Sequence, residues 1–251
     1  MVKLTYRNLM PNSYFQFKQF TIYQDKCAMK VTTDACLFGA WVANDVKNEF
    51  IKNAIDIGTG TGLLSLMILQ KNPEIEIDAI EIDSETSVQA SENIKASSWS
   101  EKARIINEEL KHFTPLKKYE LIICNPPFYE NELQPGNQKK KQAHHSSDLT
   151  LKDLVHFIKN NLANDGTFYL LLPFKRDNEI KKLLTSHHLF IQKIVFVSQS
   201  ESHGYSRIML KGRIKDKNFT ETIIETITIC NSKNEYTPEF INLLKDYYLK
   251  L

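Results

Sequence analysis

The residues best suited to chemistry in this sequence form a short motif, Asn125-Pro126-Pro127-Phe128, directly after the apolar run Leu121 to Cys124. Neither proline can donate a hydrogen bond through its nitrogen, and Pro127 biases Pro126 toward an extended backbone. The Asn125 side-chain oxygen and a nearby backbone carbonyl can therefore converge as two rigid acceptors, beside the flat face of Phe128. This set suits an amino group conjugated to a ring, because the acceptors bind its hydrogens and stabilise the charge that develops during attack.

A glycine-rich motif, Asp56-Ile57-Gly58-Thr59-Gly60-Thr61-Gly62, stands between a predicted strand at 54–57 and a predicted helix at 63–71. Its glycines allow a tight turn that a ligand can approach closely. A dinucleotide fingerprint requires a third glycine where this chain has Leu63. Asp56 suits a cationic ligand such as the sulfonium and amino group of S-adenosylmethionine. The candidate cofactor residues here are Asp56, Gly58, Thr59, Gly60 and Gly62.

The second predicted strand, at 77–82, ends with another acidic candidate, Glu81, followed by Ile82. A carboxylate at this position can accept hydrogen bonds from both hydroxyls of a ribose, as in the dinucleotide-binding fold. Asp83 is the competing candidate for that role. We therefore expect Glu81 and Ile82 to border the nucleoside part of the cofactor.

The elements that must position these motifs alternate between short apolar strands and amphipathic helices, and the chain then continues with β-rich runs at 190–198 and 207–214. This order predicts an α/β fold with a doubly wound, mostly parallel sheet whose terminal pair is antiparallel. We expect one methyltransferase-sized domain over 1–251, with an N-terminal extension at 1–30. Residues 125–149 form a long polar loop that we expect to face the active site.

That polar loop carries the clearest local cluster of positive charge, which is formed by Lys139, Lys140 and Lys141 and is followed by His144 and His145. These side chains can bind phosphates while a base enters the pocket, and Phe128 offers a surface for an unstacked base. The alternative is an ordinary solvated loop, which is what most lysine runs are.

Composition excludes several other classes of protein. The net charge is +2, so an RNA partner requires local rather than overall positive charge. The four cysteines lack the spacing of a metal site, and we expect no metal and reduced thiols. The sequence has no apolar run long enough for a membrane span, which favours a cytoplasmic protein without a membrane partner. Nothing in the sequence indicates the oligomeric state, and a monomer is assumed.

The chain resembles the bacterial tRNA1(Val) (adenine-N6)-methyltransferase family, within the class I methyltransferases that modify amino nitrogens. Four stretches carry the resemblance: CAMKVTTDACLFGAW at 27–41, DIGTGTGLLSLM at 56–67, NPPF at 125–128, and the C-terminal YTPEF and DYYLKL. The first and last are specific to the family, and the middle two mark the wider superfamily.

The resemblance implies a Rossmann-like, seven-stranded sheet with the last strand antiparallel, S-adenosyl-L-methionine as cofactor and tRNA as partner. It implies that the segment 30–34, with Lys30, Thr32 and Asp34, borders the methionine end of the cofactor. It also implies that Glu109, or its neighbour Glu108, lies near the cofactor's adenine. The implied reaction is methylation of adenine N6 in a valine tRNA, at the adenosine 3′ of the anticodon.

Other functions remain compatible with these motifs. The NPPF chemistry also fits methylation of guanine N2 in ribosomal RNA or of a glutamine amide in a release factor. From other classes, a nicotinamide oxidoreductase and a non-catalytic RNA-binding module remain, although Leu63 argues against the first and the intact motifs against the second.

Overall fold

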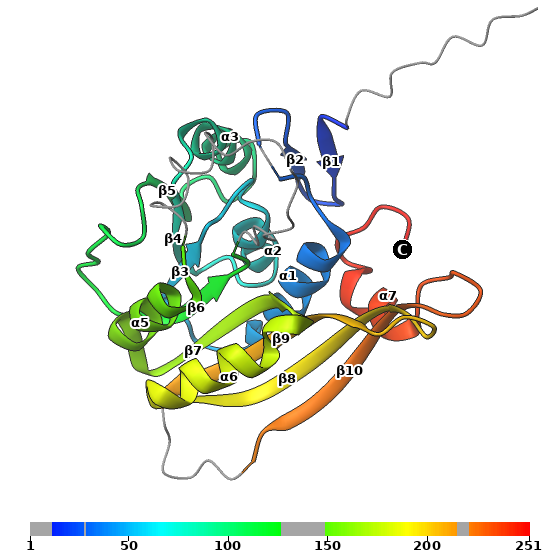
Figure 1. Ribbon diagram of the computed structural model, residues 1–251. Coiled ribbons are helices and arrows are strands. Elements are labelled where there is room, and N and C mark those ends of the chain that lie inside the picture. The colour runs from blue at the N-terminus through cyan, green and yellow to red at the C-terminus, as the bar shows by residue number, and fades with distance from the viewer. Residues whose placement is uncertain (1–11, 28, 127–148, 215–220) are drawn as a thin grey trace, which may run out of the picture.

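The strands at the centre of the fold are buried, because helices cover both faces of the sheet. β3 (Asn53–Ile57), β4 (Glu76–Glu81) and β6 (Tyr119–Cys124) are parallel neighbours that are buried along most of their length. Figure 1 shows them in the middle of the molecule. The computed structural model describes residues 12–27, 29–126, 149–214 and 221–251.

Within those residues the main sheet has the strand order β10-β8-β9-β7-β6-β3-β4-β5. β9 is antiparallel to both of its neighbours, β7 and β8, and the other pairings are parallel. The predicted α/β fold, with its mostly parallel sheet and the antiparallel pair, is therefore confirmed. The bounds of the strands not yet given are β5 (Ala103–Asn107), β7 (Leu162–Pro173), β8 (Leu189–Ser200), β9 (Tyr205–Ile214) and β10 (Ile223–Cys230).

The expected count of seven strands is one too low for the described sheet, which has eight. The additional strand, β10, extends the sheet at its edge and lies parallel to β8, so the antiparallel strand is not the last one in the sequence. The pattern at 222–230 predicts a strand, but it does not identify the partner. Strand pairing depends on packing against neighbours that are distant in sequence.

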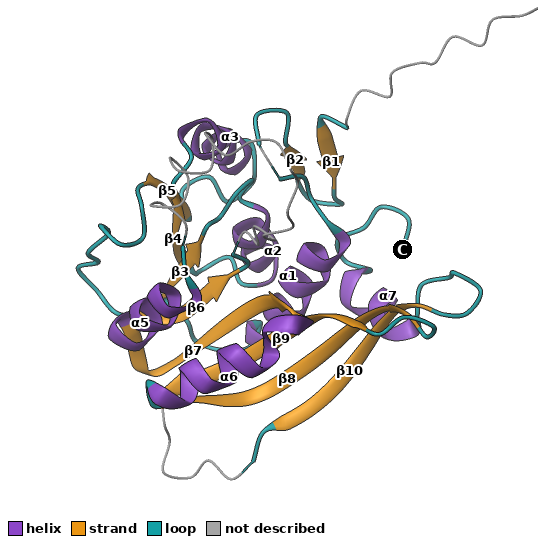
Figure 2. Ribbon diagram, viewed as in Figure 1, coloured by secondary structure: helices purple, strands orange, loops and turns teal. Residues whose placement is uncertain are grey.

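Helices cover the two faces of the sheet, as Figure 2 shows. α1 (Thr33–Val46), α2 (Leu63–Lys71) and α7 (Pro238–Leu244) pack on one face, and α3 (Ser84–Lys95) joins the same apolar cluster through Ile94. α5 (Leu151–Asn161) and α6 (Asp177–Ser186) pack on the other face. Successive residues of β6 alternate between the two clusters, as the two-residue period of a strand requires.

Polar side chains cap the N-termini of α3 and α5. The spacing of Thr150 and Asp153 in the sequence predicts a capping box, and the two residues form one at the start of α5. The sequence pattern predicts Ser84 as the cap of α3, but the structure uses Asp83, whose carboxylate accepts a hydrogen bond from the Thr86 amide at 2.8 Å. Asp83 has an extended backbone, as an N-cap requires, whereas Ser84 is already inside the helix.

The N-terminal region, which shows no clear period in the sequence, contains a small hairpin of β1 (Tyr14–Gln16) and β2 (Thr21–Tyr23). Its apolar side chains Phe17 and Ile22 are fully buried in the cluster of α1 and α2. A short 3-10 helix, η1 (Phe174–Arg176), joins β7 to α6.

Membrane-spanning helices and metal clusters are absent from the described ranges. No helix there is long and apolar enough to cross a bilayer. No group of three or more His, Cys, Asp or Glu side chains in these ranges is placed to hold a metal ion. The four cysteines are buried and free.

Candidate active site

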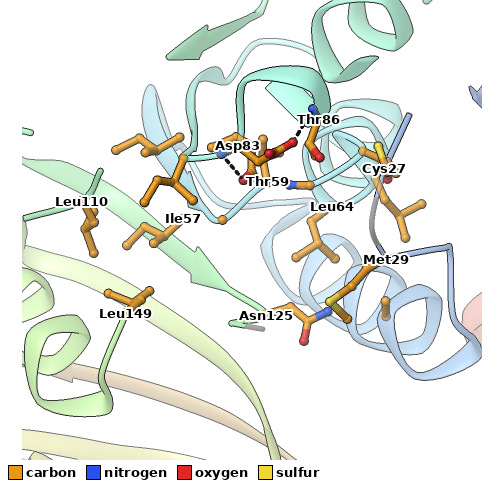
Figure 3. Close-up of a pocket in the computed structure, with 18 of the residues that line it drawn as sticks. Cys27, Met29, Ile57, Thr59, Leu64, Asp83, Thr86, Leu110, Asn125 and Leu149 are labelled. Atoms are coloured by element: carbon orange, nitrogen blue, oxygen red, sulfur yellow. Dashed lines mark hydrogen bonds between the residues drawn. The ribbon is translucent and has the colours of Figure 1, made fainter. Parts of the chain in front are cut away.

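A cavity of about 420 Å³ opens where β3, β4, β5 and β6 end. That volume lies within the range of small-molecule sites, about 300–1,000 Å³. Figure 3 shows Leu110 and Leu149 on one side of the cavity and Cys27 and Met29 on the other, with Asn125 between them. Of the residues predicted for the cofactor, the cavity is lined by Lys30, Thr32, Gly58, Thr59, Gly60, Glu81, Ile82, Glu109 and Asn125.

The glycine loop adopts a conformation that few other residues can take. Gly58, Gly60 and Gly62 have φ values of 68°, 55° and 82°, in the left-handed region that favours glycine. A Cβ on Gly58 or Gly60 would have no neighbour within 4 Å, because both positions face the open cavity. Gly62 plays a different part, since it lies outside the cavity lining as the N-cap of α2. The loop is fixed to β4 by a hydrogen bond from the Thr59 amide to the Ile80 carbonyl, 2.9 Å long.

Asp56 lies beneath this loop and is fully buried. Its Oδ2 accepts hydrogen bonds from the hydroxyls of Thr59 (2.7 Å) and Ser65 (2.8 Å). Its Oδ1 has no hydrogen-bond partner among the described residues. Burial raises the pKa of Asp56 to about 6, against the opposing effect of these hydrogen bonds. Asp56 is not part of the cavity lining, so it holds the loop from behind.

Glu81 connects the end of β4 to the same loop. Its carboxylate accepts hydrogen bonds from the amides of Gly60 and Asp83, each 3.0 Å long. Burial raises the pKa of Glu81, while these two hydrogen bonds oppose the shift. Asp83, the competing candidate, also lines the cavity, but its carboxylate caps α3.

Asn125 follows β6 at the level where the glycine loop begins, because Cys124 pairs with Ile57. Its side chain is half-buried and lines the cavity, so the NPPF motif and the glycine loop meet at one site. Pro126 is buried and lies outside the lining. The rest of the predicted catalytic motif, Pro127 and Phe128, lies outside the described residues. So do the predicted RNA-binding residues Lys139, Lys140, Lys141, His144 and His145.

The segment between β2 and α1 covers one side of the cavity. Lys30 donates a hydrogen bond to the Gln24 carbonyl, and the Val31 amide donates one to Gln24 Oε1 at 2.7 Å. The resemblance places Asp34 at the methionine end of the cofactor, but this residue lies outside the cavity lining. Its Oδ2 instead accepts a hydrogen bond from Arg207 Nε on β9, at 2.7 Å.

The end of β5 places two acidic residues at the cavity. Glu108 and Glu109 both line it, so the choice between them that the sequence left open persists. The Glu108 amide donates to the Glu81 carbonyl at 3.2 Å, which holds the two strand ends together.

Several lining residues are missing from the sequence prediction, among them Cys27, Met29, Leu110 and Leu149. Cys27 and Met29 lie within the CAMKVTTDACLFGAW stretch, so the family-specific pattern was the available signal. Leu149 directly precedes the capping box of α5, which places it at the same sheet edge. Leu110 follows Glu109 and could have been included with it.

The lining fits S-adenosylmethionine. Apolar side chains such as Ile57, Ile80 and Leu110 suit a flat adenine ring. The acidic groups suit ribose hydroxyls and positive charge. The open sides of Gly58 and Gly60 leave room for a ligand directly against the backbone.

The sheet, the glycine loop and the acidic residues at the strand ends together define a class I, Rossmann-like methyltransferase that uses S-adenosylmethionine. A family model for the methyltransferase small domain matches residues 39–189. Solved structures agree on the fold. A predicted O-methyltransferase from Agrobacterium tumefaciens aligns with a TM-score of 0.64 and 14% identity, covering 85% of this chain and 96% of that one. An S-adenosylmethionine-dependent methyltransferase from Clostridium acetobutylicum aligns with a TM-score of 0.53 and 14% identity, covering 74% and 94%.

Curated relatives narrow this class to one family. A tRNA1(Val) (adenine(37)-N6)-methyltransferase from Christiangramia forsetii is 35% identical, covering 96% of this chain and 100% of the relative. One from Trichodesmium erythraeum is 37% identical with the same coverage. The chain belongs to the tRNA1(Val) (adenine(37)-N6)-methyltransferase family, which confirms the resemblance. The oxidoreductase and the non-catalytic module are accordingly not retained.

Proposed function

We propose that this enzyme transfers the methyl group of S-adenosylmethionine to N6 of adenosine 37 in tRNA1(Val), the adenosine 3′ of the anticodon. The observation that supports this most directly is the full-length similarity to relatives with that name, 35–37% identical. The position of Asn125 at the cavity supports an amino nitrogen as the acceptor. A tRNA substrate also implies that the enzyme works in the cytoplasm. In this proposal residues 1–251 act as one catalytic domain.

In this proposal different described residues bind different parts of the cofactor. Glu81 accepts hydrogen bonds from the ribose hydroxyls, and Ile82 with Glu108 or Glu109 borders the adenine. Lys30 and Thr32 border the methionine end, beside the backbone of Gly58 and Gly60. Asp56 favours a cationic ligand from behind the loop, and Gly62 fixes the turn into α2. Asp34 acts indirectly, because its ion pair with Arg207 positions the start of α1.

When bound, S-adenosylmethionine would supply an electrophilic methyl group, whose bond to sulfur breaks as its bond to the amine nitrogen forms, leaving S-adenosylhomocysteine. Asn125 accepts a hydrogen from the exocyclic amine, which favours a pyramidal nitrogen with an available lone pair. The motif also offers a backbone carbonyl as a second acceptor and the ring of Phe128 for stacking on the base, as the sequence predicts. Orientation of the amine toward the methyl group then contributes much of the rate. No titratable base belongs to the motif, and the proton leaves to solvent after the nitrogen has been methylated.

The test is to incubate the purified enzyme with unmodified tRNA1(Val) and methyl-labelled cofactor, and to map the product by nucleoside mass spectrometry. N6-methyladenosine at position 37 is the expected product, and a transcript with guanosine at that position is the matched control that stays unlabelled. Ribosomal RNA and a release factor are included as competing substrates. Label on guanine N2 or on glutamine instead of tRNA would overturn the proposal and favour those activities.

A further inference from the structure

Three aromatic side chains form a cluster that the proposed chemistry does not use. Phe196 on β8 and Tyr205 at the start of β9 stack with ring centroids 5.0 Å apart and an interplanar angle of 24°. Phe174, directly after β7, lies 5.6 Å from Phe196 and 5.4 Å from Tyr205. We call these three rings the aromatic platform.

The aromatic platform lies at the sheet edge that carries the active site. Cys124 pairs with Leu170 on the neighbouring strand β7, so Asn125 and the last residues of β7 end at the same edge. Phe174 is the first residue after that strand. Adjacent strands lie about 4.8 Å apart, so the platform begins one strand away from β6, the strand that Asn125 follows. Figure 1 shows β7, β9 and β8 side by side, with α6 lying along them.

The platform keeps much of its ring surface in contact with solvent. Phe174 is 38% exposed and Tyr205 is 44% exposed, although both contact Phe196. The Lys181 ammonium lies 5.8 Å from the centre of the Phe196 ring. Lys181 and Tyr205 thus both contact the Phe196 ring, and the exposed parts of Tyr205 and Phe174 can contact a further flat ring.

The charge around the aromatic platform favours an anionic partner. Residues 174–186, in η1 and α6, contain four basic residues, Lys175, Arg176, Lys181 and Lys182, against the acidic Asp177 and Glu179. Arg176 pairs with Glu179 and Lys181 pairs with Asp177, so the segment keeps a net charge of +2. Exposed aromatic faces next to basic side chains are the combination that binds unpaired nucleic acid, because bases stack and phosphates pair with cations.

We propose that the aromatic platform stacks unpaired bases of the RNA substrate next to the target nucleotide, and so holds the loop while the target base enters the cavity. This inference rests on the proposed function, because it assumes an RNA substrate whose target lies in a single-stranded loop. It assigns Phe174 and Tyr205 a role in binding the substrate rather than in the methyl-transfer step.

The test compares tRNA binding by Phe174→Ala, Tyr205→Ala and Tyr205→Phe, using the full-length protein saturated with S-adenosylhomocysteine. Each alanine variant should weaken tRNA affinity about fivefold or more, the effect of losing one stacked base. Tyr205→Phe keeps the ring and should bind within about twofold of wild type. Phe50→Ala is the matched control, because Phe50 is 86% exposed but precedes the amino end of β3, at the opposite edge.

Cofactor affinity and melting temperature are measured for each variant, so that a loss of folding is separated from a loss of stacking. A fluorescent 2-aminopurine placed beside the target nucleotide should be quenched by wild type and Tyr205→Phe, and remain bright with Tyr205→Ala. If the alanine variants bind and quench like wild type, the platform has no RNA role, even though the wild-type enzyme methylates the tRNA. If wild type methylates no RNA at all, the proposed function itself has failed.

Discussion

Asn93 in α3 donates a hydrogen bond through Nδ2 to the carbonyl of Thr61 in the glycine loop, at 2.9 Å in the protein interior. The same side chain also pairs with both backbone groups of Tyr23 at the end of β2, again at 2.9 Å. One fully buried amide thus connects the N-terminal hairpin to the cofactor loop. The segment 24–32, which covers one side of the cavity, follows directly from this anchor.

We expect Asn93→Leu to weaken cofactor binding, because it leaves the Thr61 carbonyl and the Tyr23 backbone without their partner. Each lost buried hydrogen bond costs about 1–3 kcal/mol, and the melting temperature should fall too. Amide hydrogen exchange should accelerate in segment 24–32 and in the glycine loop, but not in α5 or α6. Asn242→Leu, at an exposed position of α7, is the matched control. Normal cofactor affinity and normal amide exchange in Asn93→Leu would show that Asn93 does not support the cofactor site.

Cofactor binding should depend on the loop and on Glu81. Gly60→Val places a β-branched side chain at a φ of 55° and projects it into the cavity, so it should abolish binding. Glu81→Ala should reduce affinity by about 1–3 kcal/mol through lost hydrogen bonds to a charged group. Isothermal titration with S-adenosylmethionine measures both effects. If both variants bound S-adenosylmethionine with unchanged affinity, neither the glycine loop nor Glu81 would be part of the cofactor site.

Asn125→Ala should slow the chemical step by at least about a hundredfold, the scale for removing a transition-state hydrogen-bond partner. Cofactor affinity and melting temperature should stay close to wild type, because Asn125 is half-buried and is only one of the residues that line the cavity. Single-turnover rates with saturating tRNA and cofactor provide the measurement. A near-normal rate in this variant would refute the role assigned to the amide.

Replacing Lys139, Lys140 and Lys141 together by alanine should weaken tRNA binding and flatten its dependence on salt. Each lysine that contacts a phosphate releases counterions, so losing three reduces the slope by up to about three. The matched control replaces Lys47, Lys52 and Lys118, which lie near the amino ends of the strands. Binding is measured from 50 to 300 mM salt, a range chosen as roughly that over which such contacts weaken. If tRNA affinity depended equally on salt in the two triple variants, Lys139, Lys140 and Lys141 would make no phosphate contacts.

Asp56 should make cofactor affinity depend on pH. Burial raises its pKa to about 6, so the carboxyl group is largely protonated below that pH and ionised above it. A cationic ligand favours the ionised form, and its affinity should therefore fall as the pH decreases through 6. Asp56→Asn should bind more weakly at pH 8 and lose this dependence. Titrations between pH 5 and 8 test this expectation.

The same pKa shift has an opposite consequence for stability. An acid with a higher pKa in the folded state retains its proton there, so its contribution is full below about pH 4 and is lost as the pH rises through 6. The loss amounts to roughly 3 kcal/mol for a shift from 3.8 to about 6. The free energy of unfolding of Asp56→Asn should lack this decrease.

The sequence by itself predicted the features whose conformation depends on neighbouring residues in the chain. Glycines at 58, 60 and 62 between a strand and a helix predict a tight turn, because only glycine adopts positive φ without strain. Glu81 and Asn125 each come at the end of an apolar strand, and parallel strands bring their carboxyl ends to one edge. Local sequence pattern is therefore enough to group these residues, and the fold places them around one cavity.

Tertiary structure alone decided which distant side chains meet. Asn93 and Tyr23 are 70 residues apart, and Arg207 and Asp34 are 173 residues apart. No local period records such pairs, since they depend on how whole elements pack. Asp34 accordingly faces β9 instead of the cavity, Asp83 rather than Ser84 caps α3, and β10 joins β8. The aromatic platform arises in the same way, because Phe174, Phe196 and Tyr205 come from three segments that only the twisted sheet brings together.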